Sequence, residues 1–177
     1  MSRVGKQIIE IPSSVTVNMD GNVISVKGPK GELTRTLRDE VTIKIEDGKI
    51  TSEPRRNDKF SRSLWGTYMS IIKAMIEGVQ NPFVKKLIVE GVGFKWELNG
   101  SQLKMSLGFS HPVLLEIPKS VEVVANKGEL TVTGIDKEEV TLFAMQVRKQ
   151  KRTEPYKGKG IRYSDEIIRR KEGKKSA

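Results

Sequence analysis

Short runs of alternating hydrophobic and polar residues fill the first part of the chain, as in strands with one buried face. In the clearest run, Val41, Ile43 and Ile45 alternate with Thr42 and Lys44. Turn-forming sequences separate the runs, because Gly reaches positive φ and Asp-Gly suits tight hairpins. We therefore predict strands within residues 15–17, 23–26, 32–37, 41–45 and 49–51.

The hydrophobic period then lengthens to that of a helix. From about residue 58 to residue 78, apolar side chains recur every three or four positions. Asn57 or Asp58 can cap the first turn, and Gly78 and Pro82 mark the end of the helix. Its predicted apolar face comprises Phe60, Leu64, Tyr68, Ile71, Met75 and Val79.

The second half of the chain repeats this order of strands and helix. Asp136 and Glu139 have the spacing of a capping box at a helix start. One face of that helix is predicted from the apolar residues Val140, Phe143, Ala144 and Val147. The preceding strands are predicted at residues 84–98, 102–107, 113–117, 121–125 and 129–133.

The two halves align at a separation of 80 residues. The matched pairs are Gly28 with Gly108, Leu37 with Ile117, Val41 with Val121, Gly48 with Gly128, and Ile50 with Leu130. A competing match, residues 11–15 with 117–121, covers one segment only.

A repeat of this length indicates two copies of one small domain. We predict an α+β fold of two tandem duplicated domains, each an antiparallel β-sheet with a helix packed on one face. The expected boundaries are residues 1–82 and 83–152, followed by a basic C-terminal extension at residues 153–177.

Charge is concentrated at the end of the chain. Of the net charge of +10, residues 1–147 contribute +2, from 20 Lys/Arg and 18 Asp/Glu, and residues 148–177 contribute +8, from 12 and 4. A nearly neutral body with a strongly basic end favours binding of a polyanion. The chain has no Cys, and its N-terminus leads into no long apolar stretch, so we expect a soluble, cytoplasmic protein.

The sequence offers no catalytic or metal-binding pattern. His111 is the only histidine and lies in a turn between predicted strands. Gly91-Val92-Gly93 and Gly158-Lys159-Gly160 resemble the start of a dinucleotide fingerprint, but neither opens a predicted helix. We expect no enzymatic activity, no cofactor and no small-molecule substrate.

The strongest positive signal runs from residue 148 to residue 163. Arg148, Lys151 and Arg152 share one face at the end of the second helix. Lys157 and Lys159 alternate with Gly158 and Gly160, so an extended segment would point both lysines the same way and let backbone N–H groups approach a phosphate. Aromatic residues between the cations can stack on bases or sugars, or pack on the sheet.

After residue 163 we expect a short basic amphipathic helix, with Ser164 as its cap, followed by Gly173, Lys174 and Lys175. The complete set of candidate RNA-binding residues is Arg148, Lys151, Arg152, Tyr156, Lys157, Gly158, Lys159, Gly160, Arg162, Tyr163, Arg169, Arg170 and Lys171.

Several motifs together resemble a known family. They are SRVGKQIIEIP at residues 2–12, VKGPKGEL at 26–33, GVGFKW at 91–96, LGFSHPV at 107–113 and EPYKGKGIRY at 154–163. In combination these motifs, which span nearly the whole chain, resemble the bacterial large-subunit ribosomal protein family conventionally numbered six. One departure is Thr141-Leu142-Phe143, where the resemblance implies smaller residues.

The resemblance implies two similar α+β domains with no catalysis and no cofactor. It also implies direct binding to large-subunit ribosomal RNA, chiefly by the second domain and the extension, near the elongation-factor site and the stalk base. Neighbouring ribosomal proteins would be further partners.

Two other classes of function fit the composition. One is a free RNA-binding chaperone or regulator, and the other is an interaction protein that docks on an anionic membrane through its basic end. The terminal helix expected here is short and polar for membrane docking, so we expect no membrane partner. Co-sedimentation with large ribosomal subunits distinguishes all three classes.

Overall fold

The computed structural model describes residues 3–173 and divides the chain into two compact units. The first unit ends at Pro82 and also includes Ile135–Lys137. The second comprises Phe83–Gly134 and the residues from Glu138 onward, so the basic extension is part of it. Each unit combines antiparallel strands with one helix, which confirms the α+β class.

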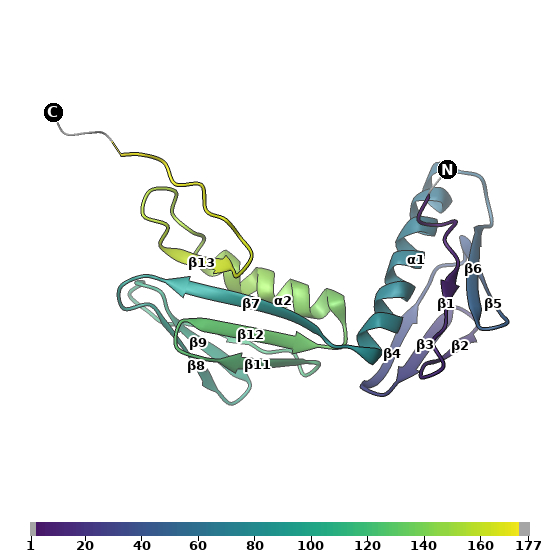
Figure 1. The fold of residues 1–177 in the computed structure, drawn as a ribbon, viewed down its shortest axis with the longest axis horizontal. Helices are drawn as coiled ribbons and strands as arrows, with labels where there is room; N and C mark the ends of the chain where they lie inside the picture. The colour runs from purple at the N-terminus through teal and green to yellow at the C-terminus, as the bar shows by residue number, and fades with distance from the viewer. Residues whose placement is uncertain (1–2, 174–177) are drawn as a thin grey trace. The chain divides into compact units, whose positions relative to one another are not determined.

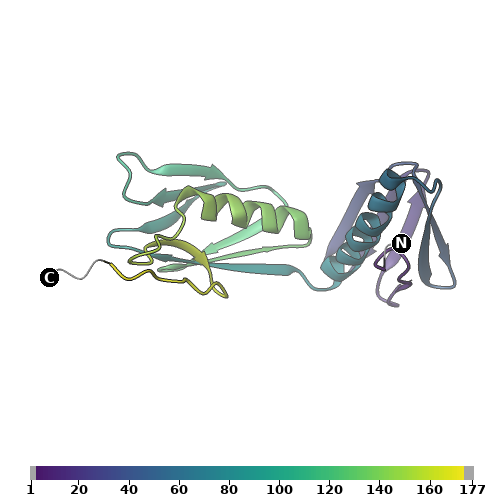
Figure 2. The same cartoon turned by 90° about the horizontal axis from the view of Figure 1, so that it is seen from above.

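Two three-stranded antiparallel sheets and one long helix make up the first unit (Figure 1). One sheet has the order β1-β6-β5 and the other β2-β3-β4. Figure 2 shows the helix α1 lying along its strands. The elements are β1 (Ile9–Glu10), β2 (Thr16–Asp20), β3 (Val23–Gly28), β4 (Gly31–Thr36), β5 (Val41–Glu46), β6 (Lys49–Pro54) and α1 (Lys59–Gln80).

The ends of α1 follow from its caps. The Asp58 carboxylate accepts a hydrogen bond from the Ser61 amide at 3.0 Å, which confirms Asp58 as a start signal. Gly78 was expected to end the helix, but it lies inside the helix and is buried. The helix continues to Gln80, and the Asn81 amide closes it on the Glu77 carbonyl at 2.8 Å.

One face of α1 packs on the strands and forms the core of the first unit. Trp65 is buried there, and its Nε1 donates to the carbonyl and hydroxyl oxygens of Ser52, both at 2.9 Å. A Cβ at Gly5 would lie 2.4 Å from the Trp65 ring, so only glycine lets the N-terminal segment cross the indole so closely.

The second unit has the same plan with one additional strand. Its sheets have the orders β11-β12-β7-β13 and β10-β9-β8, and α2 lies along the strands in Figure 2. The elements are β7 (Phe83–Glu90), β8 (Lys95–Asn99), β9 (Gln102–Ser106), β10 (Val113–Glu116), β11 (Val121–Ala125), β12 (Glu129–Gly134), α2 (Lys137–Gln150) and β13 (Gly160–Tyr163).

The prediction of one continuous strand at residues 84–98 is wrong. Residues 91–94 form a turn between β7 and β8, in which the Phe94 amide donates to the Gly91 carbonyl at 3.3 Å. Gly93 supplies a φ of +75°, which ends the extended conformation. The hydrophobic run conceals this break because strands on both sides of the turn contribute apolar residues to the same core.

The apolar face of α2 is as predicted. Val140, Phe143, Ala144 and Val147 are all buried. Phe143 is among the largest fully buried side chains of the chain, so the core accommodates the Phe in Thr141-Leu142-Phe143. The Glu139 carboxylate accepts a hydrogen bond from the Ser120 hydroxyl, and the capping box at Asp136 stays a prediction.

The duplication is confirmed by matching sheet topology and register. In the first unit Val41 pairs with Pro54, and in the second Val121 pairs with Gly134, so both partners are displaced by 80 residues. Ile50 and Leu130 are both completely buried at equivalent places. Each unit, however, divides its strands between two sheets, and β13 has no counterpart among the described residues of the first unit.

Candidate nucleic-acid interface

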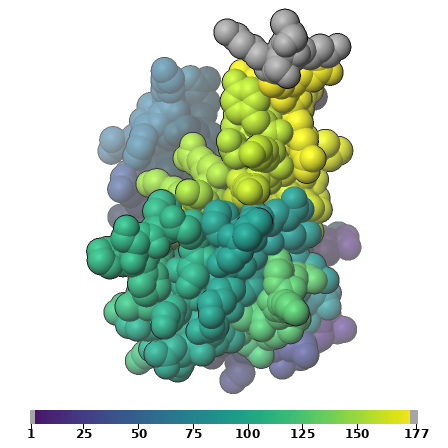
Figure 3. Space-filling view, turned by 90° about the vertical axis from the view of Figure 1, so that its left-hand side faces the viewer, coloured from purple at the N-terminus to yellow at the C-terminus, as the bar shows by residue number. Residues whose placement is uncertain are grey.

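Among the described residues, the basic part of the chain folds back onto the second unit after α2. β13 pairs antiparallel with β7, from Gly160 opposite Glu90 to Tyr163 opposite Leu87. The Ile161 amide donates to the Lys151 carbonyl at 2.8 Å, and Ile161 is fully buried. Figure 3 shows the described part of the extension, yellow-green to yellow, lying against the teal and green of the unit.

Residues 154–159 form a closed loop. The Gly158 amide donates to the Glu154 carbonyl at 3.0 Å, and the Glu154 amide donates to the Lys159 carbonyl at 2.8 Å. Lys157 is therefore in a turn and Gly158 has a positive φ, so the expected extended conformation is wrong for these two residues, whereas Gly160 begins β13. Local hydrogen bonds across the loop outweigh the extended pattern that the alternating glycines suggested.

The two glycines serve the loop itself. Gly158 has a φ of +73° and Gly160 a φ of +140°, and both are buried. A Cβ on Gly160 would lie 2.6 Å from the Arg152 carbonyl oxygen. The protein's own backbone thus explains Gly160, and close approach of RNA to the glycine backbones stays a prediction.

Six of the predicted cations lie on the surface of this region. Tyr156 lies beside them with 55% of its surface exposed, so its ring is open to stacking. The six exposed cations are Arg152, Lys157, Lys159, Arg169, Arg170 and Lys171.

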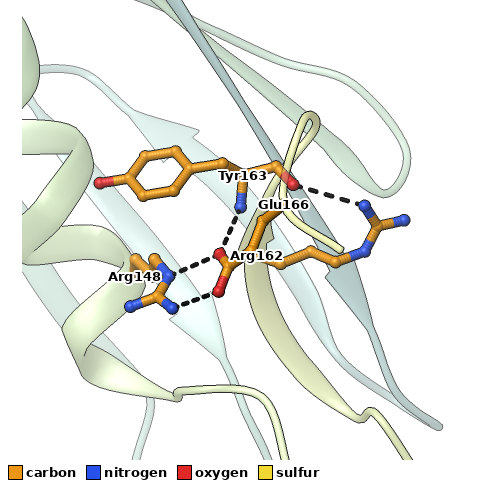
Figure 4. A network of polar contacts seen from close by, with 4 residues as sticks. All are labelled: Arg148, Arg162, Tyr163 and Glu166. Atoms are coloured by element: carbon orange, nitrogen blue, oxygen red, sulfur yellow. Dashed lines mark hydrogen bonds and ion pairs between the residues drawn. The ribbon is translucent and has the colours of Figure 1, made fainter. Parts of the chain in front are cut away.

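Arg148 is held by a carboxylate. Its Nε donates to Oε2 of Glu166 at 2.9 Å, and its Nη2 pairs with Oε1, so the contact is bidentate (Figure 4). The same Oε2 accepts from the Tyr163 amide at 3.2 Å. The hydrogen bond from Arg148 lowers the pKa of Glu166, and the same hydrogen bond raises the pKa of Arg148.

Arg162 is engaged in a similar way. Its Nη2 and Nε lie 2.9 Å and 3.2 Å from Oε1 of Glu90, and its Nη1 donates to the Tyr163 carbonyl at 3.3 Å. The Arg162 side chain is 21% exposed. Arg148 and Arg162 were predicted as RNA contacts, and in this structure both guanidinium groups are bound to carboxylates of the protein.

Two further cations, Lys151 and Lys85, lie over aromatic rings. The Nζ of Lys151 lies 4.6 Å from the centre of the Phe109 ring and 6.0 Å from that of Phe94. The Tyr163 ring has Lys85 Nζ at 5.7 Å and Arg148 Cζ at 5.6 Å. Tyr163 packs against the core, and its burial raises the pKa of the phenol.

The prediction of a terminal helix after Ser164 is wrong. Residues 166–173 have no regular secondary structure, and Ile167 is 91% exposed while Ile168 is half-buried. Two amides of the expected helix bond instead to distant carbonyls: Ser164 to Lys86 at 3.0 Å and Lys171 to Pro155 at 2.8 Å. A short isolated helix is too weakly stable to compete with these contacts. Lys174 and Lys175 lie outside the described residues.

The residues that the sequence analysis missed are mainly the partners of the cations. Glu166 lies 18 positions from Arg148, and Glu90 lies 72 positions from Arg162. No local spacing indicates such pairs, because only the tertiary fold brings them together. Lys85, Phe94 and Phe109 were missed as neighbours of the site for the same reason.

Neither a metal-binding cluster nor a membrane-spanning helix is found in the part of the chain that is described. Residues 3–173 contain no group of three or more His, Asp or Glu side chains placed to hold a metal ion. Neither described helix has the length and apolar character needed to cross a membrane.

Comparison with known proteins gives a consistent result. The family model described as Ribosomal protein L6 matches residues 11–81 and 90–164, which are the two repeats. "Large ribosomal subunit protein uL6" of Bartonella bacilliformis is 47% identical to this chain, and the proteins of that name from Bartonella quintana and Methylocella silvestris are each 46% identical. Each alignment covers 99% of both chains. Two repeats that share one topology, matched by one family model over nearly their whole length, establish that the chain belongs to the Ribosomal protein L6 family.

Proposed function

We propose that this chain is a structural constituent of the large ribosomal subunit and that it binds large-subunit ribosomal RNA directly. In this role it supports translation without catalysis. Membership of a ribosomal protein family and close similarity to proteins named for the large subunit support the first part of the proposal.

The six exposed cations around the extension support the RNA contact. Residues 148–173 contain ten Lys/Arg and four Asp/Glu, whereas residues 1–147 are nearly neutral. Phosphate groups bind surfaces of this kind with release of counterions, and an exposed aromatic such as Tyr156 adds stacking. This local concentration of accessible charge is the observation that carries the proposal.

We place the bound RNA near the elongation-factor site and the stalk base. The resemblance of residues 154–163 and of the other motifs to the family supports this location. Neighbouring ribosomal proteins complete the set of partners.

Sedimentation tests the assignment to the subunit. The tagged full-length chain should co-sediment with large subunits and remain with them through a wash at high salt. A protein found mainly in the ribosome-free fraction, yet still able to bind RNA, would identify the alternative function of a free RNA chaperone or regulator.

Site-directed cleavage tests the location. The chain contains no Cys, so Lys157→Cys would introduce a unique thiol for a tethered cleavage reagent. After incorporation into subunits, we expect strand breaks in RNA at the elongation-factor site and the stalk base. A tethered probe at exposed Lys27 of the first unit is the control for position, and cleavage confined to other regions would contradict the location.

A further inference from the structure

Two acidic side chains lie within the basic region and face its cations. Glu166 binds Arg148 and the Tyr163 amide, and Glu90 binds Arg162. Their side chains are 27% and 40% exposed, respectively. By contrast, Glu154 and Glu172 of the same region are exposed at the surface.

These contacts belong to a set that closes the extension onto the second unit. Main-chain hydrogen bonds join Ile161 to Lys151 and Ser164 to Lys86, and, within the extension, Lys171 to Pro155, at 2.8–3.0 Å. The Arg148–Glu166 pair joins the end of α2 to the chain beyond β13 (Figure 4). The described extension therefore has a defined path in the protein alone.

The negative charge of Glu166 and its contacts with the backbone should have opposite effects on RNA affinity. A carboxylate close to a phosphate-binding surface repels the phosphates, so considered as a charge alone it weakens RNA binding. As an anchor, it fixes the backbone that carries the exposed cations, which lowers the ordering cost of binding. The bidentate geometry and the additional bond to the Tyr163 amide favour the anchoring role.

We propose that Glu166, assisted by Glu90, is a positioning residue that shapes the basic extension for RNA before RNA binds. Arg148 and Arg162 then serve as internal anchors, and the exposed cations contact phosphates. This inference rests on the proposed RNA binding.

Alanine substitution of Glu166 should lower RNA affinity if the residue acts as an anchor, and should raise RNA affinity if it acts only as a repelling charge. Glu166→Ala should lower the affinity of the full chain for protein-free large-subunit ribosomal RNA by about three- to tenfold, the cost of ordering one or two side chains. The slope of log K against log salt should stay nearly unchanged, because no phosphate-binding cation is removed. Glu172→Ala, which removes the same charge from an exposed position in the same segment, should leave affinity unchanged or slightly increased.

A charge swap distinguishes anchoring from direct contact by Arg148. Arg148→Glu combined with Glu166→Arg keeps the net charge and allows the pair to reform. Positioning predicts that the double variant recovers much of the affinity that Arg148→Glu loses. Failure to recover affinity, with the pair reformed in the structure, would show that Arg148 itself contacts RNA.

Hydrogen exchange of the RNA-free protein provides the independent readout. Glu166→Ala should accelerate exchange of the Tyr163 and Lys171 amides while the core amides of β7 and β12 stay protected. Equal or tighter RNA binding by Glu166→Ala, or weaker binding without faster exchange, would overturn the inference. If the wild-type chain failed to bind the RNA, the proposed function itself would fall, whatever the exchange result.

Discussion

At the scale of single residues, Gly160 combines an unusual backbone angle with a close contact. Its φ is +140°, and a Cβ would lie 2.6 Å from the Arg152 carbonyl oxygen and 2.7 Å from the Thr153 Cα. Both neighbours are backbone atoms, which cannot move aside as a flexible side chain can. The loop and β13 therefore depend on glycine at this position.

We expect Gly160→Ala to destabilise the second unit by about 2–4 kcal/mol, from backbone strain and displacement of the loop. Denaturant unfolding of the purified protein measures the loss. Gly173→Ala is the control, since nothing lies within 4 Å of a Cβ there. Equal stability of the two variants would contradict the account of Gly160.

Protonation of Glu166 gives a second prediction at this scale. The hydrogen bond from Arg148 holds the pKa of Glu166 below its ordinary value of 4.5. A lowered pKa in the folded state means that the pair contributes stability above pH 4.5 and loses it as the pH falls through the lower folded value.

The anchor should therefore remain intact from neutral pH down to about pH 4.5. The NMR shift of the Tyr163 amide, which donates to Glu166, reports the transition. A midpoint at or above 4.5 would show that Arg148 does not stabilise the carboxylate.

At the scale of elements, α2 carries adjacent residues with opposite environments. Phe143 is 1% exposed in the core of the second unit, whereas Leu142 is 51% exposed. The difference follows from the helical period, which turns neighbouring side chains away from each other.

Phe143→Ala should lower the free energy of unfolding by about 3–5 kcal/mol, because it leaves a cavity under the helix. Leu142→Ala should change it by no more than about 0.5 kcal/mol, as expected of a surface substitution. Urea unfolding followed by circular dichroism provides both values. Similar losses for the two variants would place the core on a different face of α2.

The whole molecule joins two units of the same plan, and its net positive charge is concentrated in the last part of the second unit. We expect replacement of Lys157, Lys159 and Arg169 by Ala to reduce the salt slope of RNA binding by about two to three, at about 0.7–0.9 for each phosphate that is no longer neutralised. A triple alanine variant at the exposed residues Lys27, Lys30 and Lys49 of the first unit removes the same charge and should leave the slope unchanged. Filter-binding measurements over a salt series compare the two variants, and equal slopes would place the phosphate-binding residues elsewhere.

Periodicity predicted most of the fold because each repeat has a clear inside and outside. The strands around Val41 and Val121 and the buried face of α2 were placed correctly, since burial of alternating or helically spaced residues is encoded locally. The turn at Gly91–Phe94, which separates β7 from β8, was missed because both strands contribute apolar side chains to the same core. The helix expected after Ser164 does not form because amides of this segment donate to distant carbonyls. A local sequence pattern contains no information about such long-range hydrogen bonds.

The sequence alone determined the duplicated α+β plan, the two helices, and the basic region with its thirteen candidate residues, since hydrophobic period and charge are properties of neighbouring positions. Tertiary structure decided which of these cations are available to a ligand. It bound Arg148 to Glu166 and Arg162 to Glu90, folded Lys157 into a turn, and left Lys159 and Arg169 exposed. The physical reason is that ion pairs and loop closure depend on distances in space, which residues far apart in the chain acquire only when the sheet and helix have formed.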